Sequence, residues 1–393
     1  TANGSKLRGI FGDAAWTNKK RLPDRLLKDL IEHFSAITLS IANCPEDELG
    51  QGYEYLIKKF ADDSGHTAQE FYTNRTVVHL MTEILQPKPG ESIYDPTCGS
   101  AGMLISSIAH LKQHGEEWRN VHAYGQEINQ LSSAIGRMNL FLHGVEDFEI
   151  ANDDTLRHPA FLEAGKLRTF DMVLANPPYS IKQWDREAFA SDPYGRNFLG
   201  TPPQGGPTMP SYSISSRAWT RGVEGAPSFF PHGVLFRNEE SEMRERLVRS
   251  DLVEAVIGLG ANLFFNSPME ACILICRSEK APNRSKKILF VDASAEVTRK
   301  NAQSYLEPQH IKRIVDAYRS DEDIEGFSSH ASFSELEDNA FSLSIPLYVK
   351  PANDENADDR SIEETVESWR AASTEAASLL DNIAAKLHEN DGE

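Results

Sequence analysis

Four polar segments of this sequence could do chemistry, and each follows a short apolar or β-branched run. Small residues from Asp95 to Gly102 would let a ligand approach the backbone at a helix start, where the Asp95 carboxylate could fix a cationic or hydroxyl-bearing group. Glu127 is placed to accept hydrogen bonds from both hydroxyls of a ribose. Asp154 could accept one from the exocyclic amine of a cofactor base. Each has a plainer alternative, namely a tight turn, a solvated charge or a helix N-cap.

The fourth segment, Asn176-Pro177-Pro178-Tyr179, gives the most specific indication of the reaction type. Its prolines remove backbone donors and stiffen the turn, which leaves carbonyl acceptors and the Asn176 amide oxygen directed at one small volume. Two acceptors can hold an NH2 group by both hydrogens, and the Tyr179 ring can stack on the planar group that carries the amine. A purely structural Pro-Pro turn is the alternative, and the three ordered segments upstream argue against it. The segment therefore indicates a reaction on the nitrogen of a planar amine.

The elements that must position these segments predict a doubly wound α/β domain. Apolar or β-branched runs occur at residues 92–94, 121–124, 148–150, 171–175, 253–259 and 272–276. Several of them alternate with stretches of helical periodicity, and a further helix is expected over residues 77–85. Such alternation predicts βαβ units around a largely parallel sheet, which binds ligands at the carboxyl ends of its strands.

The flanking segments differ from this central domain, which we place at residues 69–350. Residues 1–68 hold two stretches of apolar residues at helical spacing, around 26–37 and 53–60, and predict a small helical N-terminal module. Residues 351–393 begin as an acidic linker, and apolar residues then follow a heptad register over 362–387. This helical tail would pack either on its own domain or on a helix of a partner subunit.

The charge, cysteine content and hydrophobicity of the chain limit the kinds of partner it can bind. The chain has 393 residues, with 40 Lys plus Arg against 59 Asp plus Glu, for a net charge of -19. Phosphate binding needs clustered cations, so any contact with nucleic acid must be local or supplied by a partner. Four cysteines form neither a disulfide framework nor a paired zinc motif, and no apolar run is long enough to span a membrane. We therefore expect a cytoplasmic protein, and the chemistry above needs no metal.

Taken together, the segments resemble an S-adenosylmethionine-dependent amino-methyltransferase with a Rossmann-like sheet. More narrowly, they resemble the modification (M) subunit of type I restriction-modification systems, an adenine-N6 DNA methyltransferase. The strings that carry the narrower resemblance are residues 69–75, 95–102, 175–179, 231–237 and 260–264. The resemblance covers roughly residues 25 to 320, and beside that family the chain looks short at its N-terminus.

The resemblance implies a role for each segment. The cofactor would be S-adenosylmethionine, and the residues implied to bind it are Phe71, Tyr72, Thr73, Asp95, Cys98, Gly99, Ser100, Ala101, Gly102, Glu127 and Asp154. The implied catalytic loop is Asn176, Pro177, Pro178 and Tyr179. The family also implies double-stranded DNA as substrate, a specificity (S) subunit shared by two M subunits, and a restriction (R) subunit. Two alternatives stay open: a methyltransferase for an RNA base or a protein glutamine, and an inactive assembly subunit of the same fold.

The sequence departs from the family pattern in four places. Asn74 stands where Pro is common, Ala101 where Gly is common, and Asp153 where Gly often precedes the acid. The fourth departure is residues 202–230, where 14 of 29 residues are Pro, Gly or Ser, so we expect neither the family's helix nor its core strand. The family's helix often begins Ala-Asp-Tyr-Ala-Phe-Leu. One possible coding sequence for these residues, read from its second nucleotide, encodes residues 207–212 of this chain. This match predicts two compensating frameshifts bounding about residues 205–230, and a divergent ordered loop near the DNA is the alternative.

Overall fold

The structure is a computed structural model. It describes residues 17–20, 22–38, 48–50, 52–56, 59, 73–178, 184–202, 226–264, 268–300 and 303–350. The chain divides into two units, residues 1–350 and 351–393. The predicted partner-docking helix falls in the second unit and lies outside the described residues.

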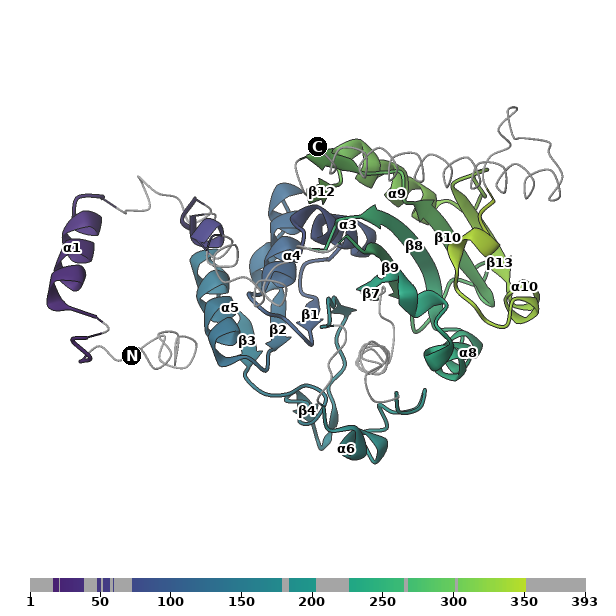
Figure 1. The fold of residues 1–393 in the computed structure, drawn as a ribbon, viewed down its shortest axis with the longest axis horizontal. Coiled ribbons are helices and arrows are strands. Elements are labelled where there is room, and N and C mark those ends of the chain that lie inside the picture. Colours follow the sequence, from purple (N-terminus) through teal and green to yellow (C-terminus); the bar gives the residue numbers. More distant parts are fainter. Residues whose placement is uncertain are drawn as a thin grey trace, which may run out of the picture. The chain divides into compact units, whose positions relative to one another are not determined.

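The first half of the central sheet is a four-stranded parallel sheet (Figure 1). Its strands are β1 (Ser92–Asp95), β2 (His122–Gln126), β3 (Phe148–Ala151) and β6 (Met172–Val173), in the order β3-β2-β1-β6. Helix α4 (Gly102–Gln113) connects β1 to β2, and α5 (Gln130–Leu142) connects β2 to β3. The chain reverses its direction of travel across the sheet between β1 and β6, which is where doubly wound sheets bind ligands. The predicted βαβ units are confirmed.

The second half is a five-stranded mixed sheet in the order β13-β10-β8-β9-β7. These strands are β7 (Ala226–Pro231), β8 (Val253–Ala261), β9 (Glu270–Cys276), β10 (Lys287–Ala293) and β13 (Ser328–Ser332). β9 is antiparallel to both β7 and β8, whereas β10 is parallel to β8. A parallel bridge between Ala175 and Ser228 joins the two halves. The sheet is therefore parallel on the side of the predicted polar segments and mixed on the other side.

The expectation that residues 202–230 contain no core strand is wrong at the end of that segment. Residues 226–230 are buried in β7, where Ser228 pairs with Leu274 of β9. Averaging composition over the segment hid two adjacent aromatic residues, Phe229 and Phe230, which fill opposite faces of the sheet. Pro227 has no N–H to donate to the ladder, but its carbonyl still accepts from the Ala175 N–H at 3.3 Å. Residues 203–225 lie outside the described residues, so the frameshift stays a prediction.

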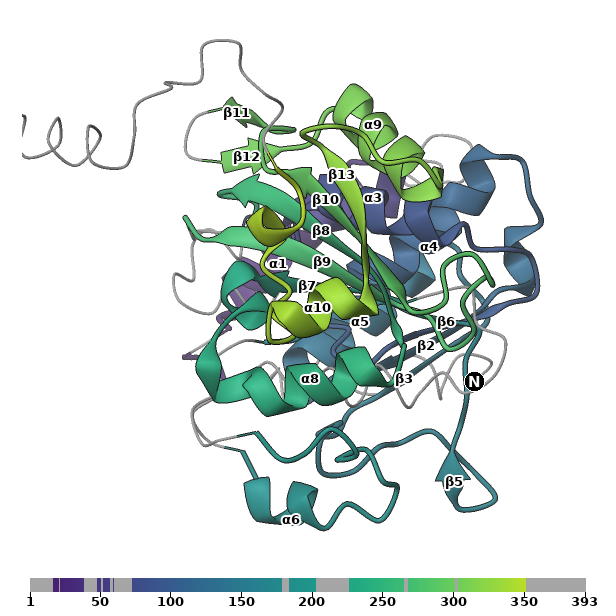
Figure 2. The ribbon, with the colours of Figure 1, turned by 90° about the vertical axis from the view of Figure 1, so that its right-hand side faces the viewer.

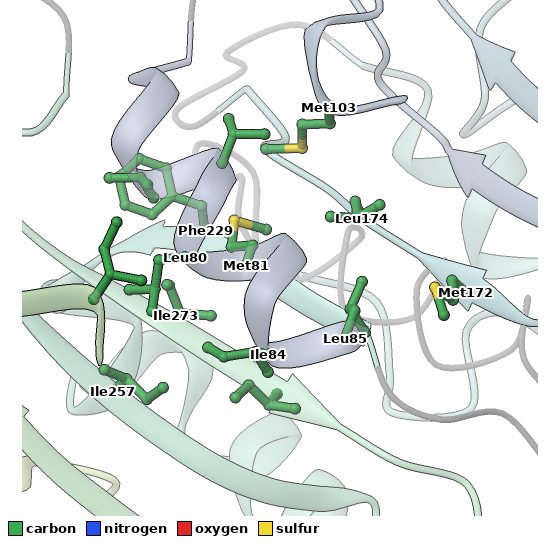
Figure 3. Packing of buried hydrophobic residues seen from close by; sticks show 14 of the residues in the cluster. Leu80, Met81, Ile84, Leu85, Met103, Met172, Leu174, Phe229, Ile257 and Ile273 are labelled. Atoms are coloured by element: carbon green, nitrogen blue, oxygen red, sulfur yellow. The ribbon is translucent and has the colours of Figure 1, made fainter. Parts of the chain in front are cut away.

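Helices cover both faces of the sheet, as the doubly wound class requires. α3 (Arg75–Leu85), α4 and α9 (Pro308–Arg319) share one apolar cluster, and α8 (Ser241–Arg249) and α10 (Phe333–Asp338) share the other. Figure 2 shows α8 and α10 in front of the sheet, with α3 and α4 behind it. Along β8, Ile257 belongs to the first cluster and Val256 to the second. Figure 3 shows the apolar side of α3 lying over the sheet, with Leu80, Met81 and Ile84 near Ile273.

The remaining elements are shorter. They are α6 (Arg186–Ala190), β4 (Leu162–Glu163), β5 (Lys166–Leu167), β11 (Thr298–Lys300), β12 (Gln303–Tyr305), η2 (Trp118–Asn120), η3 (His232–Leu235), η4 (Asn238–Glu240) and η5 (Ile345–Leu347). Near the N-terminus, α1 (Asp24–Ser35) confirms the first predicted helical stretch, although none of its residues is buried. Residues 52–56 of the second stretch are helical. Within the described ranges, no helix is long and apolar enough to cross a membrane.

Candidate active site

The predicted polar segments leave the sheet from the carboxyl ends of neighbouring strands. Asp95 at the end of β1 lies opposite Gly125 of β2, and Gln126 lies opposite Ala151 of β3. On the other side of β1, Tyr94 lies opposite Val173 of β6. Because parallel strands end at one sheet edge, this register brings the segments that begin at residues 95, 127, 152 and 176 to the same edge.

The glycine-rich turn is tied directly to the end of β2. The Cys98 N–H donates to the Gln126 carbonyl at 3.0 Å, and the Gly99 N–H donates to Glu127 Oε2 at 2.9 Å. Gly99 has φ 50° and Ala101 has φ 62°, so both adopt the left-handed conformation that glycine accepts most easily. A Cβ at Gly125 would lie 2.8 Å from the Cys98 sulfur, which shows how closely the turn packs on β2. Helix α4 begins at Gly102, as expected.

Asp95 is a buried carboxyl group whose ionisation is disfavoured. Its exposed fraction is 2%, and Oδ1 accepts from the Thr97 N–H at 2.9 Å. Burial raises the pKa of Asp95 to about 7; the hydrogen bond from Thr97 opposes this rise, and the negative charge of Glu127 adds to it. Burial also raises the pKa of the Cys98 thiol, which keeps it protonated and excludes it as a nucleophile. A cationic ligand beside Asp95 would favour its charged form.

Glu127 is held in place by backbone donors on both oxygens. Oε2 accepts from Gly99, and Oε1 accepts from the Asn129 N–H at 2.8 Å. Asn152 donates from its side chain to the Glu127 carbonyl at 2.8 Å, which fixes the backbone there as well. A carboxylate oxygen has two lone pairs, so each oxygen can accept a further hydrogen bond from a hydroxyl group. The side chain is half-buried and lies beside the glycine-rich turn, which suits the predicted contact with a ribose.

Asp154 lies in a turn that neighbouring loops brace. Its Oδ1 accepts from the Leu156 N–H at 2.9 Å, and the side chain is half-buried. The next residue, Thr155, donates from Oγ1 to the Pro96 carbonyl at 2.6 Å and so links this turn to the one that follows Asp95. The turn after Asp95, predicted to hold a cationic or hydroxyl-bearing group, and the turn of Asp154, predicted to contact the amine of a cofactor base, are therefore joined directly.

Three residues that sequence reasoning missed hold the Asp154 turn. Arg196 donates to the carbonyl groups of residues 155 and 156 at 2.5 and 2.7 Å. Its guanidinium also pairs with Asp192 at 2.6 Å, and both side chains are almost fully buried. Gln126 donates to the His158 carbonyl at 2.8 Å and accepts from the Ala160 N–H at 3.0 Å. The four-residue spacing of Asp192 and Arg196 was visible in the sequence, but it is common on protein surfaces and did not indicate burial.

Asn176 is oriented by a hydrogen bond from its amide nitrogen. Nδ2 donates to Thr73 Oγ1 at 2.9 Å, which directs the amide so that Oδ1 serves as an acceptor. Oδ1 is buried and has no hydrogen-bond partner among the residues that the structure describes. A buried acceptor left without a donor costs about 1–3 kcal/mol, so an N–H group of a ligand would be stabilised here. Pro177 is buried and Pro178 is exposed.

The first predicted cofactor segment is described only at its end. Thr73 contacts Asn176, whereas Phe71, Tyr72 and Tyr179 lie outside the described residues and stay predictions. Asn74, one of the departures from the family pattern, caps α3 by accepting from the Thr76 N–H at 3.0 Å. It also donates to the Ser304 carbonyl at 2.9 Å, a second interaction that a proline could not make.

Comparisons with known proteins agree with this geometry. The family model described as N-6 DNA Methylase matches residues 45–357. The type I restriction enzyme MjaVII methylase subunit of Methanocaldococcus jannaschii is 29% identical over 391 residues, and the match covers 96% of this chain and 65% of that protein. Two further methylase subunits from that organism are covered over 59% and 64% of their lengths. The chain thus spans less than two thirds of these relatives.

Solved structures agree as well. The type I restriction-modification methyltransferase subunit of Streptococcus thermophilus is similar with a TM-score of 0.77 and 31% identity, over 88% of this chain and 74% of that chain. A class I S-adenosylmethionine-dependent methyltransferase from Listeria monocytogenes has a TM-score of 0.59 and 17% identity, over 80% of this chain and 89% of that chain. This second likeness concerns the fold alone, and it agrees with the predicted Rossmann-like sheet.

Proposed function

The chain belongs to the N-6 DNA methylase family, and from this premise we propose that it transfers a methyl group from S-adenosylmethionine to N6 of an adenine in duplex DNA. The observation that carries the proposal is the buried Asn176 Oδ1 atom, which lacks a donor among the described residues and lies at the carboxyl end of β6. An adenine amine provides such a donor. The family description favours DNA over the alternatives of an RNA base or a protein glutamine.

The residues at the sheet edge fit the cofactor that the family implies. Asp95 and Glu127 place two carboxyl groups beside a turn of small residues, which suits a ligand with a cationic amino acid part and a ribose. Asp154 would accept from the exocyclic amine of the cofactor's adenine, as expected from the sequence. The cofactor, when bound, supplies an electrophilic methyl group on a sulfonium centre.

The chain's own residues would hold the target amine. The base must leave the duplex to reach Asn176, and stacking on Tyr179 would offset part of the few kcal/mol that this costs. Asn176 Oδ1 and the Pro177 carbonyl would each accept one hydrogen of the amine, which aligns the nitrogen lone pair for attack. Positive charge would develop on the nitrogen as its bond to the methyl group forms and the bond from that methyl group to sulfur breaks, and both oxygens would stabilise this charge until the nitrogen loses one proton to water. The hydrogen bond from Asn176 to Thr73 keeps the amide oxygen as the acceptor.

We propose that the chain acts as the M subunit of a type I restriction-modification complex. Two relatives that match this chain over 391 and 383 residues are named type I restriction enzyme methylase subunits. In this proposal two M subunits share one S subunit, which supplies sequence recognition, and R subunits join for cleavage. The net charge of -19 supports a division of labour in which a partner supplies much of the DNA affinity. The acidic tail at residues 351–393 would dock on helices of the S subunit.

The test measures N6-methyladenine formed in mixed-sequence duplex DNA from labelled S-adenosylmethionine, with and without the proposed S subunit. Methylation that requires the S subunit would support the proposal. Asn176→Ala should retain cofactor binding and lose about 10²–10³ in turnover, because one oriented acceptor is removed. Asn283→Ala is the matched control, since Asn283 is exposed and donates to Asp321 at 2.9 Å. Wild-type turnover in Asn176→Ala would refute the mechanism, and cofactor binding without methylation in the full complex would identify an inactive assembly subunit.

A further inference from the structure

Two pairs of potential metal ligands face one another where α3 and α4 pack together. His79 and Glu83 lie four residues apart on α3, and His110 and His114 lie four residues apart at the end of α4. Residues at this spacing share one face of a helix. One ligand atom from each of Glu83, His110 and His114 lies within 4.8 Å of the others. The rings of His110 and His114 are also close, with centroids 4.2 Å apart.

Hydrogen bonds prepare these histidines to act as ligands. His114 Nδ1 lies 2.8 Å from the His110 carbonyl, and because a carbonyl only accepts, this nitrogen carries the hydrogen and Nε2 keeps its lone pair. His110 Nδ1 lies 2.9 Å from Glu83 Oε1, so these two ligand atoms are already adjacent, and a bound ion would replace the proton between them. A hydrogen bond such as that from His114 to the His110 carbonyl orients the histidines of known metal sites.

We propose that Glu83, His110 and His114 bind a divalent transition metal of the zinc class, with His79 as the fourth ligand. His79 Nδ1 lies 3.9 Å from Glu83 Oε1, within reach of the same ion. Imidazole nitrogens with one carboxylate oxygen form a typical donor set for four-coordinate Zn²⁺. Metal-ligand bonds of about 2.0–2.2 Å put tetrahedral ligand atoms about 3.4 Å apart, so small rotations of these side chains complete the site.

The surroundings allow an ion to enter. His114 is exposed, and the side chain of His79 is 45% exposed, so the open side of the cluster faces solvent. Glu83 and His110 form its half-buried and buried side. The cluster therefore combines ordered ligands on one side with accessible ligands on the other.

The position of the cluster points to a structural role. α3 begins directly after Thr73 and Asn74, and α4 begins at the end of the glycine-rich turn, so both helices start at the candidate active site. Glu83 is ten residues beyond Thr73, or about 15 Å along a helix, so a metal there would not touch the reacting groups. A metal that joins the two helices would brace the segments that they carry. This inference is independent of the proposed methyl transfer.

The test uses the full, tag-free chain after treatment with a chelator. Zn²⁺ is titrated in competition with a chromophoric chelator, and Co²⁺ is then added so that its visible absorption reports the coordination geometry. We expect one high-affinity Zn²⁺ per chain, a tetrahedral Co²⁺ spectrum and a higher melting temperature with Zn²⁺. His114→Ala should weaken binding by at least about tenfold, and Glu83→Gln should weaken it similarly.

His122→Ala is the matched control. His122 is also paired with a carboxylate, Asp147 at 2.6 Å, but it lies on β2 outside the cluster, so the variant should bind Zn²⁺ like the wild type. His114 is exposed at the end of α4, so its replacement leaves folding intact, and circular dichroism of both cluster variants checks this. Unchanged Zn²⁺ affinity in folded His114→Ala and Glu83→Gln, or the absence of stoichiometric binding by the wild type, would overturn the inference.

Discussion

Replacing Asp95 by Asn should stabilise the cofactor-free protein, and the gain should depend on pH. Asp95 is buried at the end of β1, and its pKa is raised from 3.8 to about 7, mainly by burial. An asparagine has nearly the same shape, and its oxygen can still accept the hydrogen bond from the Thr97 N–H. The substitution therefore removes the cost of burying a charge and keeps the local hydrogen bond.

The pKa values give the magnitude and the sign. A rise of about 3 pKa units is worth about 4 kcal/mol, at about 1.4 kcal/mol for each unit. Well below the unfolded-state pKa of 3.8, Asp95 is protonated in both the folded and unfolded states, so the two proteins should differ little from this cause. As the pH rises from 4 to 7, the unfolded state releases the proton first and the wild type loses stability. We expect Asp95→Asn to be more stable by about 2 kcal/mol at pH 5 and by about 4 kcal/mol at pH 8.

The assay is urea unfolding of both cofactor-free proteins at several pH values between 5 and 8. Asp154→Asn is the control. It removes a carboxylate at the same sheet edge, but the Asp154 side chain is half-buried and more accessible to water than Asp95, so its replacement should change the unfolding free energy less. The reasoning fails if the difference in unfolding free energy between wild type and Asp95→Asn is the same at pH 5 and pH 8. It also fails if Asp95→Asn is less stable than the wild type at pH 8.

Four further predictions concern the same site. Cofactor affinity of the wild type should rise as pH increases through 7, because a cationic ligand prefers ionised Asp95; calorimetric titration would show a flat profile if this is wrong. Thr73→Val should lower kcat about tenfold with a smaller effect on KM, because Asn176 loses the acceptor for its amide nitrogen, and Thr73→Ser should restore the rate. Asn74→Ala should lower the unfolding free energy by about 1 kcal/mol through loss of the α3 cap, as measured by denaturation. Arg196→Ala should cost about 3–5 kcal/mol, because Asp192 stays buried without its partner, and unchanged stability would contradict the buried ion pair.

The parallel half of the fold could be predicted because its signals are local. Each of its strands is a short apolar run followed by a polar turn, and strand ends in a parallel sheet meet at one edge. The sequence therefore predicts that Asp95, Glu127 and Asp154 lie near one another, and the register of β1, β2 and β3 agrees. The orientation of Asn176 could not be predicted, since Thr73 is far from it in sequence and only the fold brings them together.

Other parts depended on contacts that the sequence does not display. β7 was missed because its burial follows from its neighbours β6 and β9, while its composition resembles a loop. Arg196 looks like a surface cation until the fold surrounds it with carbonyl groups. The cluster of Glu83, His110 and His114 was missed because it joins two helices, and neither helix alone carries a complete ligand set.

The bridge between Ala175 and Ser228 has a consequence for how this protein can vary. The chain leaves the sheet after Ala175 and returns to the neighbouring strand at Ala226, so both ends of the excursion are anchored side by side. The entropic cost of closing such a loop grows slowly with its length, by about 0.6 kcal/mol for each doubling. Changes of length or sequence within residues 203–225 should therefore leave Asn176 and the buried Asp192–Arg196 pair in place. The architecture separates a fixed reaction centre from an adjacent stretch of chain that evolution can exchange.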